Sequence, residues 1–179
     1  MNHRMSPKLN DLAAEVLERR AASLATVEQA EVVHDRASLL AFRLGDEWYA
    51  VPIEHVREIY NEFELTPIPC VPPHVKGVIN IRGEIISVTD LAVLMGVSHS
   101  EDVDHSSAIV VQNEGCATAM VVDAISDIVD VEVDSIEPPI AAADKGLAAE
   151  FVTGSAFIDG RLVALINAEK VLEPIGASN

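Results

Sequence analysis

Residues 77–91 read GVINIRGEIISVTDL, two β-branched runs that are separated by Arg82 and Gly83. Valine and isoleucine favour strands, and a glycine supplies the positive φ angle that a tight hairpin turn requires. Asp90 follows as an N-cap, because its carboxylate can accept the unpaired backbone N–H groups of a helix start, and Gly96 fits a left-handed C-cap. The stretch therefore predicts a β-hairpin that runs directly into a short helix.

The same pattern returns 77 positions later without a gap. Gly77 corresponds to Gly154, and the cap Asp90 corresponds to Asn167. Apolar residues of the second hairpin, around the turn that contains Gly160, match those of the first in type. This is an internal repeat, and it predicts a second hairpin and helix near the C-terminus.

A second match, at a shift of 69 positions, places residues 53–59 over residues 122–128. The two matches follow one another along the chain. Residues 39–96 and 107–172 are therefore predicted to be two copies of one β-rich unit, joined by the polar connector 98–107. Each copy has roughly 60 residues and buries too little surface to be stable by itself, so we expect that neither half folds alone.

Further elements follow from the local pattern. A closing helix is predicted over residues 168–172, and short helical or turn-like segments are predicted over residues 54–59 and 123–128. Four prolines between residues 62 and 73 exclude a helix there and indicate an extended segment. Strands are predicted over residues 40–42, 48–53, 108–112, 117–122 and 129–133.

Residues 1–37 differ from the rest because their apolar residues recur at helical spacing. Ser6 and Pro7 are typical of a helix start. We expect a helical extension that docks on a protein surface, and the pattern leaves open whether that surface belongs to this chain or to a partner. The docking face is predicted at Leu9, Leu12, Val16 and Leu17.

Composition limits the possible partners. The chain of 179 residues has 12 lysines and arginines against 29 aspartates and glutamates, a formal net charge of −17. Such acidity repels phosphate backbones and anionic lipids, so we expect no nucleic-acid partner and no direct membrane contact, and a basic protein surface suits the chain better. The two cysteines are too few for a disulfide framework, and no signal peptide or membrane span is recognisable, which predicts a cytoplasmic protein.

Sequence patterns of catalysis are missing. The chain has no GxSxG, HExxH, GxxxxGK or GxGxxG motif, and its histidines are scattered. The sequence therefore favours a binding module over an enzyme, with no cofactor. A rival hypothesis is a small-molecule or metal-sensing regulatory domain that uses acidic loops such as the connector, although this connector lacks the ligand spacing of a zinc site.

The chain resembles the CheW family of bacterial chemotaxis coupling proteins. The resemblance rests on LLAFRLGDEWYAVPIEHVREI, GVINIRGEIISVTDL, VVDAISDIVDV and INAEKVL, in the order and spacing of the family. It implies a CheW-like domain over residues 38–174 with a mostly β fold of two five-stranded SH3-like barrels. We expect the two barrels to have a common interface core and to exchange strands near the chain ends. It also implies a non-catalytic adaptor that couples chemoreceptors to the histidine kinase CheA.

The partners implied by the resemblance are the regulatory domain of CheA, the helical hairpin at the chemoreceptor tip, and further CheW copies in arrays. Receptor binding would recruit the cytoplasmic chain to membrane-associated arrays. Kinase and receiver segments are missing from the sequence, which favours a free-standing coupling protein.

The resemblance also implies two sets of site residues. One set is a receptor-binding groove at Leu40, Ile53, Val56 and Ile125. The other set controls the kinase and comprises Glu58, Gly77 and Arg82, of which we expect Arg82 to pair with Glu58. From the residues alone, Val56 and Ile125 favour burial in the core over a groove, and Arg82 fits a solvated turn as well as a functional role.

Overall fold

The computed structural model describes residues 18–19, 35–98, 107–139 and 146–173, and the chain divides into two compact units, residues 1–34 and 35–179. In the first unit Glu18 and Arg19 are described, and both are helical. The docking face predicted at Leu9, Leu12, Val16 and Leu17 lies outside the described residues. So does most of the polar connector.

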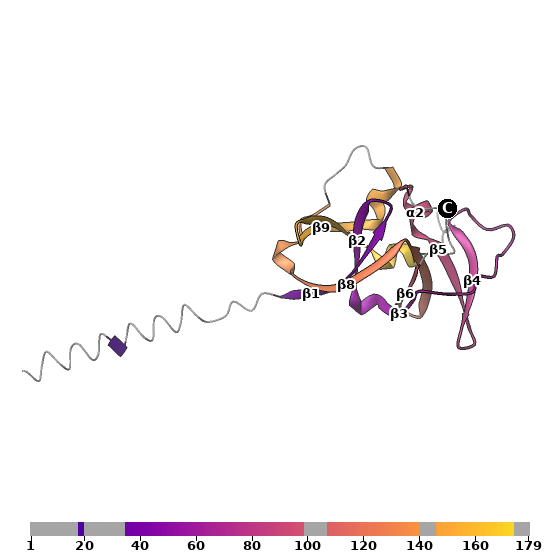
Figure 1. Ribbon diagram of the computed structural model, residues 1–179, viewed down its shortest axis with the longest axis horizontal. Helices are drawn as coiled ribbons and strands as arrows, with labels where there is room; N and C mark the ends of the chain where they lie inside the picture. The colour runs from indigo at the N-terminus through magenta and orange to yellow at the C-terminus, as the bar shows by residue number, and fades with distance from the viewer. Residues whose placement is uncertain (1–17, 20–34, 99–106, 140–145, 174–179) are drawn as a thin grey trace, which may run out of the picture. The chain divides into compact units, whose positions relative to one another are not determined.

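The second unit consists of ten strands and short helices among its described residues (Figure 1). In chain order they are β1 (Arg36–Leu44), β2 (Glu47–Pro52), η1 (Ile53–His55), β3 (Val56–Tyr60), β4 (Val75–Ile81), β5 (Glu84–Asp90), α2 (Leu91–Met95), β6 (Ser107–Asn113), β7 (Cys116–Val122), β8 (Ala124–Glu132), η3 (Val133–Ser135), η4 (Gly146–Phe151), β9 (Val152–Ile158), β10 (Arg161–Ile166) and α3 (Ala168–Leu172).

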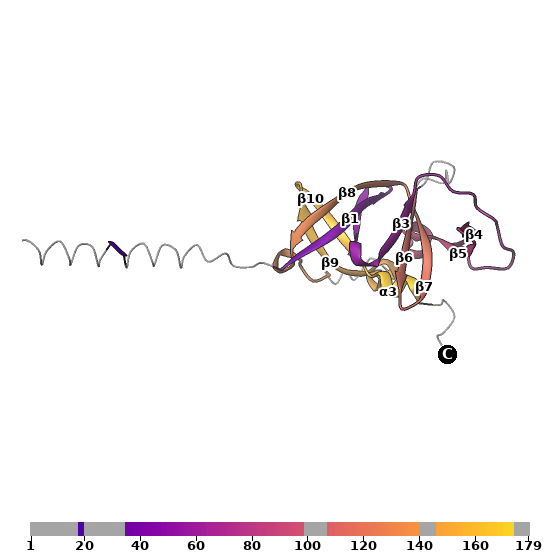
Figure 2. The same ribbon diagram turned by 90° about the horizontal axis from the view of Figure 1, so that it is seen from below.

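The strands form two five-stranded sheets, each of which combines both copies of the repeat. Barrel 1 has the order β8-β1-β2-β10-β9, and barrel 2 has the order β3-β6-β7-β5-β4. The first hairpin of each copy thus lies in the barrel that the other copy completes. Figure 2 shows the indigo β1 beside the orange β8, with the yellow β10 in the same barrel.

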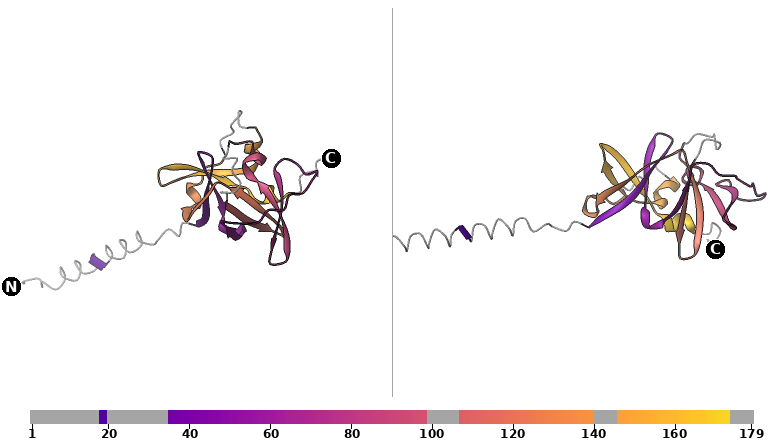
Figure 3. Two further views of the ribbon diagram at one scale, coloured as in Figure 1. Left: turned by 45° about the vertical axis from the view of Figure 1, so that its right-hand side comes forward. Right: turned by 60° about the horizontal axis from the view of Figure 1, so that its bottom comes forward.

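This exchange is larger than the sequence predicts. Strand exchange was expected near the chain ends, whereas the two copies trade whole first hairpins in a reciprocal way. The trade depends on one parallel pairing in each barrel, β2 with β10 and β5 with β7. The barrels therefore do not coincide with the copies, and Figure 3 shows the strands of early and late sequence intermixed.

Three apolar clusters hold the unit together. One belongs to barrel 1, one to barrel 2, and the largest lies between them with contributions from β1, β2, β6, β7, α2 and α3. Leu39 belongs to the barrel 1 cluster and its neighbour Leu40 to the shared cluster, so β1 is buried on both faces. The expected common interface core is this shared cluster.

The predicted helix caps are confirmed. Asp90 Oδ1 accepts a hydrogen bond from Val93 N at 3.1 Å, and Asn167 Oδ1 accepts one from Lys170 N at 3.1 Å. Gly96 has the left-handed conformation, with φ 70° and ψ 30°, at the end of α2. The helix α3 has the predicted bounds, and α2 lies between the predicted caps Asp90 and Gly96. Both are predictable because these signals act over three or four residues.

Two predicted segments are wrong. Residues 54–59 were expected to be a helical turn and residues 123–128 to be turn-like, but most of each is strand, in β3 and β8. Val56 is opposite Val111 of β6, and Ile125 is opposite Phe42 of β1. A ladder to a distant strand outweighs the weak local helical pattern. In addition, β1 begins at Arg36, inside the segment that was expected to be helical.

Candidate functional site

The predicted groove residues meet at the shared core. Ile53 begins η1, Val56 begins β3, and Ile125 lies near the start of β8. All three side chains are half-buried and pack against the shared cluster. Val56 and Ile125 occupy equivalent positions of the repeat, so the reciprocal exchange of hairpins brings both to the same cluster. We call these three partly exposed apolar side chains, which all pack against the shared cluster, the seam.

Leu40 differs from the other three residues. Its side chain is 2% exposed and belongs to the shared cluster itself. Leu40 can therefore support the seam from within, but it presents almost no surface to a partner. The exposed part of the seam is formed by Ile53, Val56 and Ile125.

Arg82 and Glu58 form the predicted pair. Arg82 Nη2 lies 3.4 Å from Glu58 Oε2, and Arg82 Nη1 donates to Glu58 Oε1 at 3.4 Å. The Arg82 side chain is 81% exposed, whereas that of Glu58 is 18% exposed. The pair joins β3 to the turn between β4 and β5. Both contacts are long and the arginine is solvated, so the pair adds about 0 to 1 kcal/mol to stability.

Glu58 belongs to a wider ionic cluster that sequence reasoning missed. The hydroxyl of Tyr60 donates to Glu58, and Arg57 Nε lies 3.6 Å from Glu58 Oε1. Arg57 Nη2 also donates to Glu84 Oε2 at 2.7 Å. The hydrogen bond to Glu84 raises the pKa of Arg57, and the same bond lowers the pKa of Glu84. The hydrogen bond to the Glu58 carboxylate raises the pKa of Tyr60.

Arg57, Glu58 and Tyr60 are neighbours in β3, whereas their partners Arg82 and Glu84 belong to the distant β4–β5 hairpin. No sequence pattern joins the whole cluster for that reason. The alternation of β3 places Glu58 and Tyr60 on one face, and this spacing of two was the available signal. The result is a surface of fixed, paired charges around a solvated arginine at a hairpin tip. Such a surface can recognise a partner through charge and hydrogen bonds.

Gly77 has a structural reason to be glycine. A Cβ atom at this position would lie 2.2 Å from the backbone oxygen of Thr66, and the φ angle of Gly77 is 149°. Thr66 and Val78 exchange backbone hydrogen bonds of 2.8 and 2.9 Å, so the proline-rich segment pairs with the outer edge of β4 at this point. The glycine lets that segment approach the strand.

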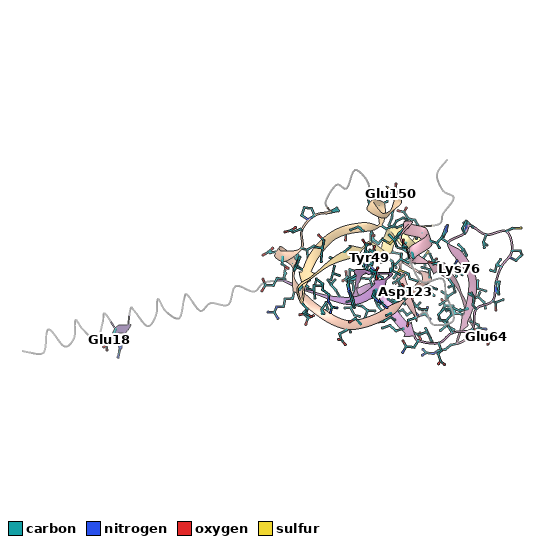
Figure 4. All side chains as sticks on the ribbon, turned by 45° about the horizontal axis from the view of Figure 1, so that its top comes forward. Glu18, Tyr49, Glu64, Lys76, Asp123 and Glu150 are labelled. Atoms are coloured by element: carbon teal, nitrogen blue, oxygen red, sulfur yellow. The ribbon has the colours of Figure 1, made fainter. Side chains whose placement is uncertain are left out.

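Asp123, labelled in Figure 4, follows β7 and has a local structural role. Its Oδ2 accepts a hydrogen bond from Gly45 N at 2.6 Å and so fixes the turn of the β1–β2 hairpin. No group of three or more His, Cys, Asp or Glu among the described residues is placed to hold a metal ion. No helix in the described part of the chain is long and apolar enough to cross a membrane.

Comparison with known proteins identifies the family. The model of the CheW-like domain matches residues 38–175. The chain belongs to the CheW family. It is 36% identical over 134 residues to the chemotaxis protein CheW of Rhizobium meliloti (strain 1021), which covers 74% of this chain and 85% of that protein. It is 34% identical over 155 residues to the CheW of Klebsiella aerogenes, covering 84% of this chain and 90% of that protein.

A solved structure agrees with the CheW assignment. The crystal structure of the scaffolding protein TtCheW from Thermoanaerobacter tengcongensis superposes with a TM-score of 0.68 at 31% identity, covering 74% of this chain and 90% of that chain. The expected fold of two five-stranded barrels is thereby confirmed. The rival hypothesis of a metal-sensing or small-molecule-sensing domain finds no support in these comparisons.

Proposed function

We propose that this chain couples chemoreceptors to the histidine kinase CheA. The chain is a chemotaxis coupling adaptor, and the observation that carries this is the match of the CheW-like domain to nearly the whole second unit. We further infer that it works without catalysis, through protein surfaces alone. Its relatives include a protein described as a scaffold, which supports that inference.

We assign the receptor to the seam that Ile53, Val56 and Ile125 provide. An amphipathic helix that is laid into an apolar groove gains its affinity from a few anchors, and a hot spot is worth about 2 kcal/mol or more. These side chains are half-buried, so they are held in place by the shared core and still offer surface to a helix. Leu40 supports the seam from within the shared core.

We assign kinase control to the hairpin tip that carries Arg82 and Glu58. An arginine fork binds carboxylates in a directed way, and Arg82 is exposed enough to exchange partners. Gly77 contributes indirectly, because it lets the proline-rich segment pair with β4, a strand of this hairpin. Recruitment to receptor arrays would then follow from receptor binding, without a membrane contact of its own.

Two substitutions at the seam test the receptor assignment. Val56→Ser and Ile125→Ser should each weaken binding to a receptor cytoplasmic fragment by about 30-fold, which corresponds to one lost hot spot of about 2 kcal/mol. Binding is measured by calorimetry and folding by a thermal melt. Val133→Ser serves as the control, since Val133 is a 44% exposed valine that does not belong to the predicted groove.

Weakened binding with a near-normal melt in both variants supports the assignment. An affinity that stays unchanged would remove the groove from the receptor site. If the melting temperature fell together with the affinity, Val56 and Ile125 would belong to the core.

A further inference from the structure

A pocket of about 600 Å³ opens beside barrel 1. Its lining is mostly apolar and comes from β2, β9, β10 and the end of α2. Tyr49 and Met95, which are 4% and 2% exposed, belong to the shared core, and Ala164 packs against that core. The pocket is thus backed by rigid, closely packed side chains. The lining residues that matter here are Trp48, Tyr49, Met95, Val97, Leu162 and Ala164.

An exposed apolar pair continues this pocket onto the surface. Phe157 of β9 and Leu162 of β10 face each other across the hairpin and are 74% and 55% exposed. Leu162 also lines the pocket, so the pair and the pocket form one apolar surface. We call it the hairpin surface and define it by Phe157, Leu162, Ala164, Tyr49 and Met95. Large exposed apolar side chains that gather beside a cavity are typical of binding sites.

The fold does not need the phenylalanine of this apolar pair. The repeat places Asn80 and Ile85 at the equivalent positions of the β4–β5 hairpin, where they also face each other. Asn80 Oδ1 accepts a hydrogen bond from Gly83 N at 2.8 Å and so stabilises its own turn. A phenylalanine cannot make this bond, yet the β9–β10 hairpin forms with the same register. The aromatic ring of Phe157 is therefore surplus to the hairpin.

Acidic groups surround the hairpin surface. Asp46 and Glu47 line the pocket, and Asp159 stands in the β9–β10 turn, two residues after Phe157. The hydroxyl of Tyr49 donates to Glu47 Oε2 at 2.6 Å, which keeps that carboxylate at the pocket. Among the described lining residues the one basic group is Arg161, whose Cζ lies 4.8 Å from the ring centre of Trp48 and so covers an aromatic face. The charges favour a basic ligand.

A strand is a poor fit for this surface, whereas a helix suits it. Ser155 of β9 already exchanges backbone hydrogen bonds of 2.8 and 2.9 Å with Glu137, so the outer edge of the strand is covered there. The face of the hairpin is open instead, and an amphipathic helix places successive apolar anchors along such a face.

We propose that the hairpin surface binds an amphipathic helix of a partner protein, with one apolar anchor in the pocket, others over Leu162 and Phe157, and lysine or arginine residues beside the rim carboxylates. The surface shares no lining residue with the predicted receptor groove. It would give the adaptor a second helix-binding site, and it does not depend on receptor or kinase binding.

The chain carries its own reporter for this test. Trp48 is its one tryptophan and lines the pocket. The probe is a synthetic leucine–lysine amphipathic helix of about five turns, roughly 18 residues, without aromatic residues. A leucine–glutamate peptide of the same pattern is the matched probe. The lysine peptide should change the Trp48 emission of the full chain in a saturable way, and the glutamate peptide should not.

Substitutions then locate the binding. Phe157→Asn, which installs the residue of the other hairpin, and Leu162→Ser should each weaken the affinity for the lysine peptide about tenfold by calorimetry. Ala164→Leu, which fills the pocket, should weaken it similarly. Ile85→Ser is the matched control, because Ile85 is 62% exposed at the position equivalent to Leu162, and it should leave the affinity unchanged. Thermal melts confirm that each variant is folded.

Several results would overturn the proposal. If both peptides bound equally well, or if Ile85→Ser and Leu162→Ser lowered the affinity equally, the peptide binding would be non-specific adsorption. Tighter binding of a peptide of residues 1–34 would make the chain's own segment the occupant. Self-association of the full chain that Leu162→Ser abolishes would make a second copy the occupant.

Discussion

Barrels 1 and 2 have the same strand order and differ at their hairpin tips. In barrel 2 the tip carries Arg82, paired with Glu58. The equivalent positions of barrel 1 are Asp159 and Asp127, two carboxylates that cannot form an ion pair with each other. The copies agree at the turn glycines and helix caps, which the backbone conformation requires. They differ in the side chains at the hairpin tips.

The conformation of the turn does not explain why residue 82 is an arginine. Arg82 and Asp159 have φ angles of 52° and 48°, and each precedes a glycine of positive φ. Since an aspartate fills the same backbone conformation, the turn does not require an arginine. The identity of Arg82 therefore needs another reason, and partner recognition is the one that we propose.

The largest expected effect comes from separating the two copies. A chain cut within the connector, near Ser100, should give two halves that are each unfolded by circular dichroism. The reason is the exchange of hairpins, which leaves β1 and β2 without β8 and β10, and β3 and β5 without β6 and β7. Mixing the halves should restore the β signal. A half that folds alone would contradict the reciprocal exchange.

A smaller effect distinguishes the two glycines of the repeat. Gly77→Ala should lower the free energy of unfolding by about 2 to 4 kcal/mol, because the new Cβ meets the Thr66 oxygen and the φ angle is unfavourable. Gly154→Ala should cost less, since its Cβ would lie 2.7 Å from the Glu137 oxygen without a positive φ. Urea denaturation measures both. Equal losses of unfolding free energy would show that the chain approaches both glycines equally closely.

The sequence predicts the parts of this fold that depend on near neighbours. Both capped helices and the turn glycines follow from signals within a few residues. By contrast, β3 and the first half of β8 were missed, because their strand character comes from pairing with β6 and β1. The exchange was underestimated for a related reason. A repeat predicts which strands each copy has, but not which strands pair with one another.

The site was predicted unevenly for similar reasons. The pairing of Arg82 with Glu58 is confirmed, and it came from the family resemblance. The contact of Arg57 with Glu84 joins distant strands without any pattern in the sequence. Phe157 was passed over because an apolar residue in an alternating strand is usually read as core. The roles of the groove and kinase-control residues stay predictions.

A third comparison concerns His74, whose repeat equivalent is Phe151. Both are buried, and both backbone oxygens accept a hydrogen bond of 2.7 Å from the cap residue that precedes a helix. His74 Nε2 is buried and makes no hydrogen bond to any described residue, and burial lowers the pKa of His74. His74→Phe should therefore raise the free energy of unfolding by roughly 1 kcal/mol at neutral pH.

The gain should grow in acid. Because the native pKa of His74 lies below that of the unfolded chain, near 6.5, the unfolded state takes up the proton first as the pH falls. Wild-type stability should thus drop relative to the variant below about pH 6.5, until the native histidine titrates too. Urea midpoints from pH 8 to pH 5 measure this. Parallel curves would remove His74 as the cause.

The smallest effect on stability is expected for Arg82→Ala. The arginine is 81% exposed, its contacts with Glu58 are 3.4 Å long, and Asp159 shows that the turn forms without it. An exposed ion pair contributes about 0 to 1 kcal/mol, so the melting temperature should stay nearly unchanged while kinase control weakens. Glu58→Gln provides the partner variant. It removes the charge and keeps most of the shape, although Glu58 also accepts from Tyr60.

The two variants can be separated by a double-mutant cycle. If the Arg82–Glu58 contact is what the kinase reads, each single change should weaken CheA activation in reconstituted receptor arrays. The double variant should then lose little more than either single one, because both changes remove one interaction. Additive losses would mean that Arg82 and Glu58 contact the partner independently. A large fall in melting temperature for Arg82→Ala would instead make the arginine structural, and the difference between the two hairpin tips would then concern folding and not recognition.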